Sequence, residues 1–231
     1  MKHRRLADSS RMCGRYALYG PKSRYRAAFN AELMDDINDT KIPFRFPLPA
    51  DVAFWDIRPT TVQPVVLEDG GKRLLTMFRW GLIPFWAKEL KGANTPFNAR
   101  LDTAADKPSF KQAFRQRRCV VPVDAFYEWY AIPGQKAKQR YIIKPPDDAS
   151  WGLAGLWDVW NGPEGPIPSF TIITTEPNEL MATIHDRMPV ILKAQNYAAW
   201  LDRELIEADQ VRALCEPYPT ELMQAEPFTP P

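Results

Sequence analysis

The sequence predicts a single compact α+β domain with a mixed, mainly antiparallel β-sheet system and a few flanking helices. Its 231 residues include 23 prolines, which interrupt nearly every candidate element and so favour short strands and loops over long helices. Several short segments rich in β-branched and aromatic residues are separated by turn signals, as expected for strands. Hydrophobic residues make up 45% and charged residues 25% of the chain, which is typical of a globular domain long enough to bury one core.

The clearest local signal is a β-hairpin. Residues 62–67 and 73–79 flank Asp69-Gly70-Gly71, and adjacent glycines suit a tight hairpin turn. The other expected strands cover residues 119–123, 126–130, 141–144, 151–159 and 170–175. The expected helices cover residues 24–33, 109–115, 194–201 and 207–214, and two proline-rich segments, 42–49 and 216–231, are expected to be extended. We divide the chain into a leader (1–12), a domain (13–220) and a proline-rich tail (221–231).

The composition excludes several classes of protein. No apolar run approaches the ~18 residues that a membrane helix needs, and the N-terminus lacks the apolar core of a secretory signal, so we expect a cytoplasmic, nucleoid-associated protein with no membrane partner. The formal charge of +2 is too small to indicate nucleic-acid binding. The 3 cysteines, Cys13, Cys119 and Cys215, are widely spaced and fit neither a disulfide framework nor a zinc site. We expect no metal or other cofactor, and inert, buried thiols at Cys119 and Cys215.

Cys13 directly follows the internal residue Met12. The stretch that ends at Met12, MKHRRLADSSRM, is mostly polar or charged and has no hydrophobic period. If translation begins at Met12 and this methionine is removed, Cys13 becomes the first residue. Its α-amine and thiol then form a 1,2-aminothiol, a group that condenses with aldehydes.

Glu128 is a lone carboxylate among aromatic residues in Phe126-Tyr127-Glu128-Trp129-Tyr130, on an expected strand. The two-residue period of a strand places Tyr127 and Trp129 on one face. Glu128 falls on the other face, where desolvation of a carboxylate would raise its pKa and allow proton transfer near neutral pH. The alternative is an edge strand that leaves Glu128 in solvent, and the sequence alone does not choose between the two.

Two further segments carry candidate polar groups. His185 lies in the polar stretch Ile184-His185-Asp186-Arg187-Met188-Pro189. It is either a loop residue that is hydrogen-bonded to the backbone or a general acid or base. Asn98 and Arg100 follow an aromatic segment, residues 78–86, that also contains an arginine. Aromatic residues interleaved with arginines occur on surfaces that bind single-stranded nucleic acid. Packing of tryptophans in the core would also account for the pattern.

The candidate residues also suit other classes of protein. Cys13, His185 and Asn98 could serve a cysteine hydrolase in which the histidine activates the thiol. Their order along the chain differs from the papain-like order, which counts against that interpretation. A third alternative is a non-enzymatic single-strand binding module, which would lose affinity with salt.

Five segments together resemble the SOS response-associated peptidase (SRAP) family of abasic-site processing proteins. They are Met12-Cys13-Gly14-Arg15-Tyr16, Trp80-Gly81-Leu82-Ile83-Pro84, Asn98-Ala99-Arg100, Phe126-Tyr127-Glu128-Trp129 and Ile184-His185-Asp186-Arg187-Met188-Pro189. They occur in the family's order over residues 12 to about 220. The resemblance implies an SRAP-like domain and an enzyme of the DNA damage response.

The resemblance also implies a reaction. Family members bind single-stranded DNA and crosslink to abasic sites through the α-amine and thiol of an N-terminal cysteine, which is exposed when the initiator methionine is removed. The amine forms a Schiff base with the ring-opened sugar, the thiol closes a thiazolidine ring, and the crosslink is reversible. The implied partner is therefore single-stranded DNA with abasic sites, bound by a monomer. Peptidase or hydrolase activity, and lyase activity, belong to the same implied class.

By the same resemblance, Cys13 is the nucleophile and Glu128 is the acid–base group that assists opening of the sugar ring. Asn98 orients the sugar or the cysteine amine, and His185 transfers protons on the opened sugar and assists reversal. The implied DNA-binding residues are Arg15, Arg100 and Arg187 on phosphates, Trp86 and Trp129 on bases, and Pro59 and Thr174 close to the lesion.

This chain departs from the family pattern in two places. Residues 1–12 precede Cys13, and with them attached the cysteine has no free α-amine. A start at Met12, or removal of the leader, self-cleavage included, would restore that amine. Many relatives carry a second tryptophan after the Trp86 position, where this chain has Ala87, which weakens the expected stacking.

Overall fold

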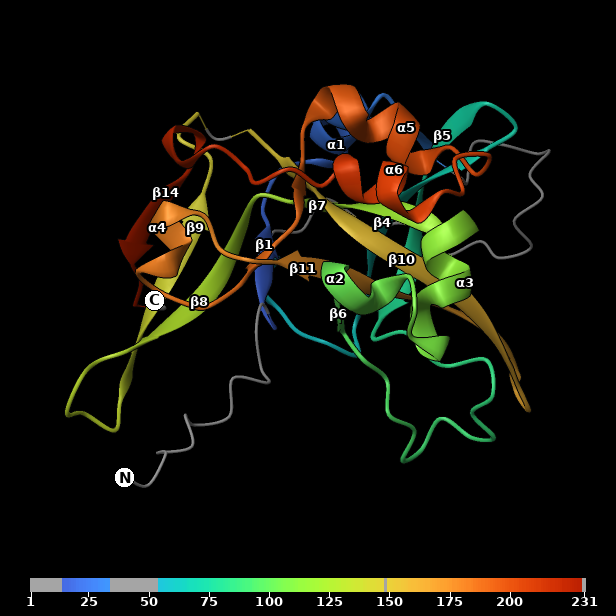
Figure 1. Ribbon diagram of the computed structural model, residues 1–231, viewed down its shortest axis with the longest axis horizontal. Coiled ribbons are helices and arrows are strands. Elements are labelled where there is room, and N and C mark those ends of the chain that lie inside the picture. Colours follow the sequence, from blue (N-terminus) through green and yellow to red (C-terminus); the bar gives the residue numbers. More distant parts are fainter. Residues whose placement is uncertain (1–13, 34–53, 148, 230–231) are drawn as a thin grey trace.

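The computed structural model describes residues 14–33, 54–147 and 149–229, and it confirms the predicted α+β class (Figure 1). Within these residues the strands form one sheet of five strands and one of nine. Cys13 and the proline-rich segment 42–49 lie outside the described residues. None of the described helices is long and apolar enough to cross a membrane.

The five-stranded sheet is antiparallel, in the order β14-β9-β8-β1-β3. Its strands are β1 (Tyr16–Leu18), β3 (Phe54–Ile57), β8 (Ala125–Ala131), β9 (Lys138–Lys144) and β14 (Gln224–Pro227). The predicted strand at 126–130 is β8, and the one predicted at 141–144 begins earlier, as β9. The C-terminal segment is extended at β14, where it pairs with β9. Part of the expected tail is therefore a strand of this sheet.

The nine-stranded sheet is mixed, in the order β12-β11-β10-β7-β4-β5-β2, with β13 beside β10 and β6 beside β11. Its strands are β2 (Glu32–Leu33), β4 (Val62–Asp69), β5 (Lys72–Trp80), β6 (Asn98–Arg100), β7 (Arg118–Val123), β10 (Trp151–Gly162), β11 (Gly165–Thr175), β12 (Met188–Pro189) and β13 (Ile191–Leu192). β2 runs parallel to β5, and β11 runs parallel to both β5 and β6. The strands predicted at 119–123, 151–159 and 170–175 are β7, β10 and β11.

The predicted hairpin is β4 and β5, joined at Gly70 and Gly71. These two glycines have φ angles of 60° and 81°. Consecutive left-handed residues are the mark of a type I′ turn, whose twist matches that of the flanking strands. The hairpin prediction is confirmed.

The described helices are short. They are α1 (Lys22–Phe29), α2 (Leu101–Ala104), α3 (Pro108–Gln116), α4 (Glu179–Ala182), α5 (Tyr197–Leu201) and α6 (Ala208–Ala213), with 3-10 turns at Ala194–Asn196 and Thr220–Leu222. In Figure 1, α1, α5 and α6 gather at the top of the molecule. The helices predicted at 109–115 and 207–214 are α3 and α6, while the one predicted at 194–201 divides into a 3-10 turn and α5.

The predicted helix at 24–33 is wrong beyond Phe29. Asn30 adopts a left-handed conformation with φ of 46°, which closes the C-terminus of α1, as asparagine often does. Its backbone N–H donates to the Ala27 carbonyl, and that of Ala31 donates to the Arg26 carbonyl. Residues 32–33 then form β2 beside β5.

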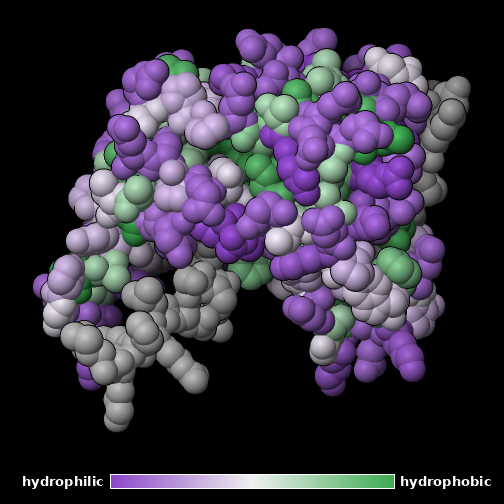
Figure 2. Space-filling view, viewed as in Figure 1, coloured by the Kyte–Doolittle hydropathy of each residue, from purple (hydrophilic) through white to green (hydrophobic). Residues whose placement is uncertain are grey.

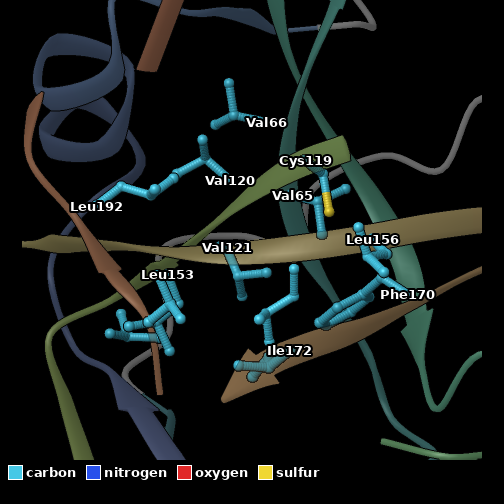
Figure 3. Close-up of a cluster of buried hydrophobic side chains, with 14 of the residues drawn as sticks. Val65, Val66, Cys119, Val120, Val121, Leu153, Leu156, Phe170, Ile172 and Leu192 are labelled. Carbon is cyan, nitrogen blue, oxygen red and sulfur yellow. The ribbon is translucent and has the colours of Figure 1, made fainter. Parts of the chain in front are cut away.

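The core lies on the neighbouring strands β4, β7, β10 and β11 (Figure 3). Val121, Leu153 and Phe170 are fully buried there. Cys119 lies in this cluster, and Cys215 is buried after α6. Burial raises the pKa of both thiols, that of Cys215 to about 12, so both are protonated and inert at neutral pH. The predicted burial of these two thiols is confirmed.

Candidate functional site

A cavity of about 590 Å³ collects several of the predicted site residues. Its lining residues are Gly14, Arg15, Pro59, Phe97, Glu128, Trp129, Lys138 and His185. They come from the start of β1, the β3–β4 loop, the residue before β6, strands β8 and β9, and the loop between α4 and β12. Figure 2 shows the surface indented at its lower edge, beside the lobe formed by the loop that follows β5. The fold therefore assembles one site from segments far apart in the sequence.

Glu128 lies on the cavity wall and is only 1% exposed. Strand β8 pairs with β1 on one side and β9 on the other, with Glu128 opposite Tyr141 of β9. The edge-strand alternative, which places Glu128 in solvent, is therefore wrong. A carboxylate buried at a cavity wall is suited to proton transfer with a bound molecule.

His185 lines the same cavity and is also hydrogen-bonded to its own loop. Its Nδ1 atom accepts the Arg187 backbone N–H at 3.3 Å and lies 2.9 Å from Asp186 Oδ1. Burial lowers the pKa of His185 below the usual 6.5, against the opposing charge of Asp186. The ring is therefore neutral at pH 7 and can accept a proton. The loop hydrogen bond of the first sequence-based alternative is confirmed, and the acid–base role of the second stays a prediction.

The lowered pKa of His185 predicts a pH dependence of stability. Above pH 6.5 the ring is neutral in the folded and the unfolded chain, so stability is unaffected. As the pH falls below that value the unfolded chain binds the proton first, and stability is lost down through the folded pKa. We expect the melting temperature of the wild type to fall more steeply between pH 7 and roughly pH 5 than that of His185→Gln, measured by circular dichroism. Parallel curves would contradict this assignment.

Arg15, Trp129 and Pro59 also line the cavity. The Arg15 guanidinium lies 5.7 Å from the centre of the Trp129 ring. Pro59 precedes Thr60, whose φ of 77° is strained for a β-branched residue. The Thr60 N–H donates to the Trp80 carbonyl at 2.8 Å, which helps to hold this turn. Strained backbone of this kind is enriched at functional sites.

Arg100, Thr174 and Arg187 form a group beside the cavity and are not among its lining residues. Thr174 pairs with Arg100 across β11 and β6. Arg187 is buried, donates to the Thr174 carbonyl at 2.7 Å and pairs with Glu176 at 3.0 Å. Arg100 pairs with Asp102 through two hydrogen bonds, of 3.1 and 2.7 Å, and is half exposed. Arg100 is thus the more accessible of these two cations, and a phosphate at Arg187 would compete with Glu176.

Asn98 lies on β6, and Trp86 lies on the loop after β5. Asn98 is the partly buried first residue of β6 and pairs with Ile172 of β11. It follows Phe97, which lines the cavity and whose carbonyl accepts the Trp80 indole N–H at 2.9 Å. Trp86 is 48% exposed and packs edge-on against Phe85, which is 68% exposed. Neither Asn98 nor Trp86 lines the cavity itself.

Three cavity residues were not predicted from the sequence as site residues: Gly14, Phe97 and Lys138. Gly14 and Phe97 adjoin predicted residues, so their positions could have indicated them. Lys138 stands at the start of β9, ahead of the strand that the sequence predicted, and carried no local signal. In the part of the chain that the structure describes, no group of three or more His, Cys, Asp or Glu side chains could hold a metal ion.

The fold is shared with solved proteins. A crystal structure of a protein from Bacteroides thetaiotaomicron matches with a TM-score of 0.76 and 26% identity, covering 94% of this chain and 92% of that one. A crystal structure from Bordetella bronchiseptica matches with the same TM-score and identity, over 94% of this chain and 100% of that one. These matches show that the chain shares its α+β fold with solved proteins.

Residues 12–230 match the family model described as SOS response associated peptidase (SRAP), and the chain belongs to this family. It is 38% identical over 215 residues to the abasic site processing protein YoqW of Bacillus subtilis (strain 168), covering 93% of this chain and 91% of that relative. It is 33% identical over 197 residues to the abasic site processing protein HMCES of Mus musculus, covering 69% of this chain and 56% of that relative. The family assignment made from the sequence motifs is confirmed.

Proposed function

We propose that this protein processes abasic sites in single-stranded DNA by forming a covalent, reversible thiazolidine crosslink through Cys13. The observation that carries the proposal is the cavity at the start of β1. Gly14, which is covalently bonded to Cys13, lies on its wall with Glu128, His185 and Arg15. The similarity to YoqW and HMCES, both named abasic site processing proteins, supports the same assignment.

The proposed reaction joins both groups of an N-terminal cysteine to one sugar carbon. The hemiacetal of the abasic sugar opens to an aldehyde, with its hydroxyl proton transferred to the ring oxygen. The α-amine adds to the aldehyde carbon and loses water to give an imine. The thiol then adds to the imine carbon and its proton passes to nitrogen, which closes the thiazolidine ring. Reversal retraces these steps and needs water.

We assign each candidate residue a role in this reaction. The buried carboxylate of Glu128 exchanges protons with the sugar during ring opening. The neutral ring of His185 accepts a proton and returns it during imine formation and reversal. Asn98, next to cavity residue Phe97, orients the sugar or the amine. The guanidinium groups of Arg15 and Arg100 hold phosphates that flank the lesion.

The remaining predicted residues would hold the strand. Trp129, in the cavity, and Trp86, exposed on the loop after β5, supply rings on which bases stack. Pro59, which lines the cavity with Trp129, would lie close to the lesion. Thr174 and Arg187 support the neighbouring wall through their hydrogen bond, and Arg187 adds positive charge there. We propose that the protein acts as a monomer in the nucleoid, where abasic single strands arise.

The test compares two proteins, one beginning at residue 1 and one beginning at Cys13. Each is incubated with an oligonucleotide that contains one abasic site, and the products are separated on a denaturing gel. We expect a shifted band from the protein that begins at Cys13, and none from the longer protein unless its intact mass shows that residues 1–12 have been removed. Absence of the band from the shorter protein would overturn the proposal. Cleavage of a peptide without DNA would instead support the cysteine hydrolase alternative.

Replacing Glu128 with glutamine is expected to slow the crosslink by roughly 10²-fold, because it removes the proton-exchanging carboxylate while keeping the side-chain size. The measurement is the initial rate of adduct formation in a protein that begins at Cys13. Glu164→Gln, at an exposed turn residue, is the matched control and should leave the rate unchanged. An unchanged rate for Glu128→Gln, with an unchanged melting temperature, would remove this residue from the mechanism.

A further inference from the structure

Asp56, the third residue of β3, receives hydrogen bonds from three arginines. Arg15 Nη1 lies 2.8 Å from both carboxylate oxygens. Arg58 donates through Nε at 3.0 Å and Nη2 at 2.6 Å, and Arg140 Nη2 donates at 3.3 Å. We refer to Arg15, Asp56, Arg58 and Arg140 as the arginine cluster. Three cations and one anion leave it with two uncompensated positive charges.

The five-stranded sheet brings the arginine cluster together at the cavity. Arg15 precedes β1, which pairs with β3 and β8. Trp129 of β8 pairs with Arg140 of β9, so the two side chains are cross-strand neighbours. The Arg140 guanidinium lies 3.8 Å from the centre of the Tyr127 ring and 5.4 Å from that of Trp129. Arg15 and Trp129 line the cavity, which places the cluster at its rim.

The stability of the fold does not account for this arrangement. The side chains of Arg58, Asp56 and Arg15 are 59%, 34% and 30% exposed, and ion pairs exposed to solvent contribute little to stability. Arg140 is only 12% exposed, so its guanidinium has lost most of its hydration. Its buried Nε has no hydrogen-bond partner among the described residues. Repulsion among three neighbouring cations adds to these costs.

The geometry resembles the recognition of a phosphodiester. The two oxygens of the Asp56 carboxylate accept from a fork of guanidinium groups, as the two non-bridging oxygens of a backbone phosphate would. The cluster also adjoins Trp129, which lines the cavity, and Arg58 precedes the cavity residue Pro59. Partial burial would raise the pKa of Asp56, but the hydrogen bonds from Arg58 and Arg15 hold it below its usual value. The carboxylate is therefore charged at neutral pH, like the group it resembles.

We propose that Arg15, Arg58 and Arg140 form a subsite for one backbone phosphate of single-stranded DNA, and that Asp56 occupies this subsite when no strand is bound. The inference rests on the proposed function, in that the ligand is the strand held at the cavity. An incoming phosphate reaches the cluster from the exposed side of Arg58 and displaces the carboxylate. Because the strand must compete with Asp56, this carboxylate weakens the binding of every strand. A strand that also fills the cavity gains further contacts and is favoured over one that does not. Arg58, Arg140 and Asp56 thereby join the residues that bind DNA.

The experiment measures the affinity of three variants of the full chain for a fluorescent, undamaged oligothymidylate over a series of salt concentrations. We expect Arg58→Gln to bind several-fold more weakly, and the slope of log affinity against log salt to fall by about 0.7 because one phosphate contact is lost. We expect Asp56→Asn to bind several-fold more tightly at each salt concentration. Arg115→Gln, at an exposed arginine of α3, removes the same charge away from the cavity and should retain the wild-type slope. Melting temperatures identify any variant that is misfolded.

A wild-type slope for Arg58→Gln overturns the subsite, and so does an Asp56→Asn variant that binds no more tightly than the wild type. These outcomes differ from failure of the proposed crosslink, which is scored separately with abasic DNA and protein that begins at Cys13. An adduct with abasic DNA together with identical salt slopes would remove the subsite alone. A reduced slope for Arg58→Gln without any adduct would remove the crosslink and retain the subsite. No binding of oligothymidylate by the wild type overturns the subsite, while the crosslink is still decided by adduct formation with abasic DNA.

Discussion

Replacing Cys13 with serine, in a protein that begins at residue 13, is expected to abolish the stable adduct with abasic DNA and to leave an imine that borohydride can trap. The α-amine is unchanged in this variant, so it still condenses with the sugar aldehyde. The thiol that closes the thiazolidine ring is absent, and the imine hydrolyses. We therefore expect no shifted band on a denaturing gel without reductant, and a shifted band when borohydride is present during the incubation.

Cys215→Ser is the matched control for this substitution. Its thiol is buried, and its sulfur lies 3.8 Å from the Val211 carbonyl, to which a serine hydroxyl could donate as well. Burial raises the pKa of Cys215 to about 12, so it should not react, and this variant should form the adduct at the wild-type rate. A stable adduct of Cys13→Ser without reductant would show that the amine alone is sufficient, and would remove the thiazolidine from the proposed mechanism.

Local signals in the sequence predicted those parts of the fold that local chemistry determines. Gly70 and Gly71 can both adopt positive φ angles, so the β4–β5 hairpin followed from two residues. The end of α1 depends on the left-handed conformation of Asn30, which many asparagines do not adopt. The pairing of β14 with β9 joins segments some 80 residues apart in the sequence, and no local pattern encodes such a contact.

In the site, too, local sequence signals predict some features, and contacts between distant segments determine the others. The motif around Glu128 predicted its strand and face correctly, but its burial depends on β1 and β9, which lie on either side of β8. The sequence shows Arg187 as a charged residue before Met188 and does not show that it is buried against Thr174. Asp56 and Arg140 lie in unrelated segments, and only the antiparallel register of the five-stranded sheet brings them together. A motif thus identifies chemistry, while burial and partners depend on tertiary pairing.

Arg118, the first residue of β7, connects the ends of two helices through its buried guanidinium. Its side chain donates to the carbonyls of Phe114 (2.8 Å), Arg115 (2.6 Å), Trp200 (2.6 Å), Leu205 (3.0 Å) and Asp202. The first two lie in the last turn of α3, and Trp200 lies near the end of α5, where helix carbonyls lack partners within the helix. Burial lowers the pKa of Arg118 to about 10, so it remains charged at neutral pH and complements the negative ends of both helices.

Replacing Arg118 with methionine is therefore expected to destabilise the fold by about 3 kcal/mol, because several buried carbonyls lose their donor while the side-chain volume is largely kept. For a chain of this length that corresponds to a fall in melting temperature of roughly 6–12 °C. Thermal unfolding followed by circular dichroism measures it. Arg203→Met is the matched control, because Arg203 is exposed and its guanidinium donates to the Glu68 carbonyl at 3.0 Å, and its melting temperature should stay close to that of the wild type. Equal melting temperatures for the two variants would mean that water replaces the guanidinium at these carbonyls, and that β7 and the two helix ends are held by apolar packing alone.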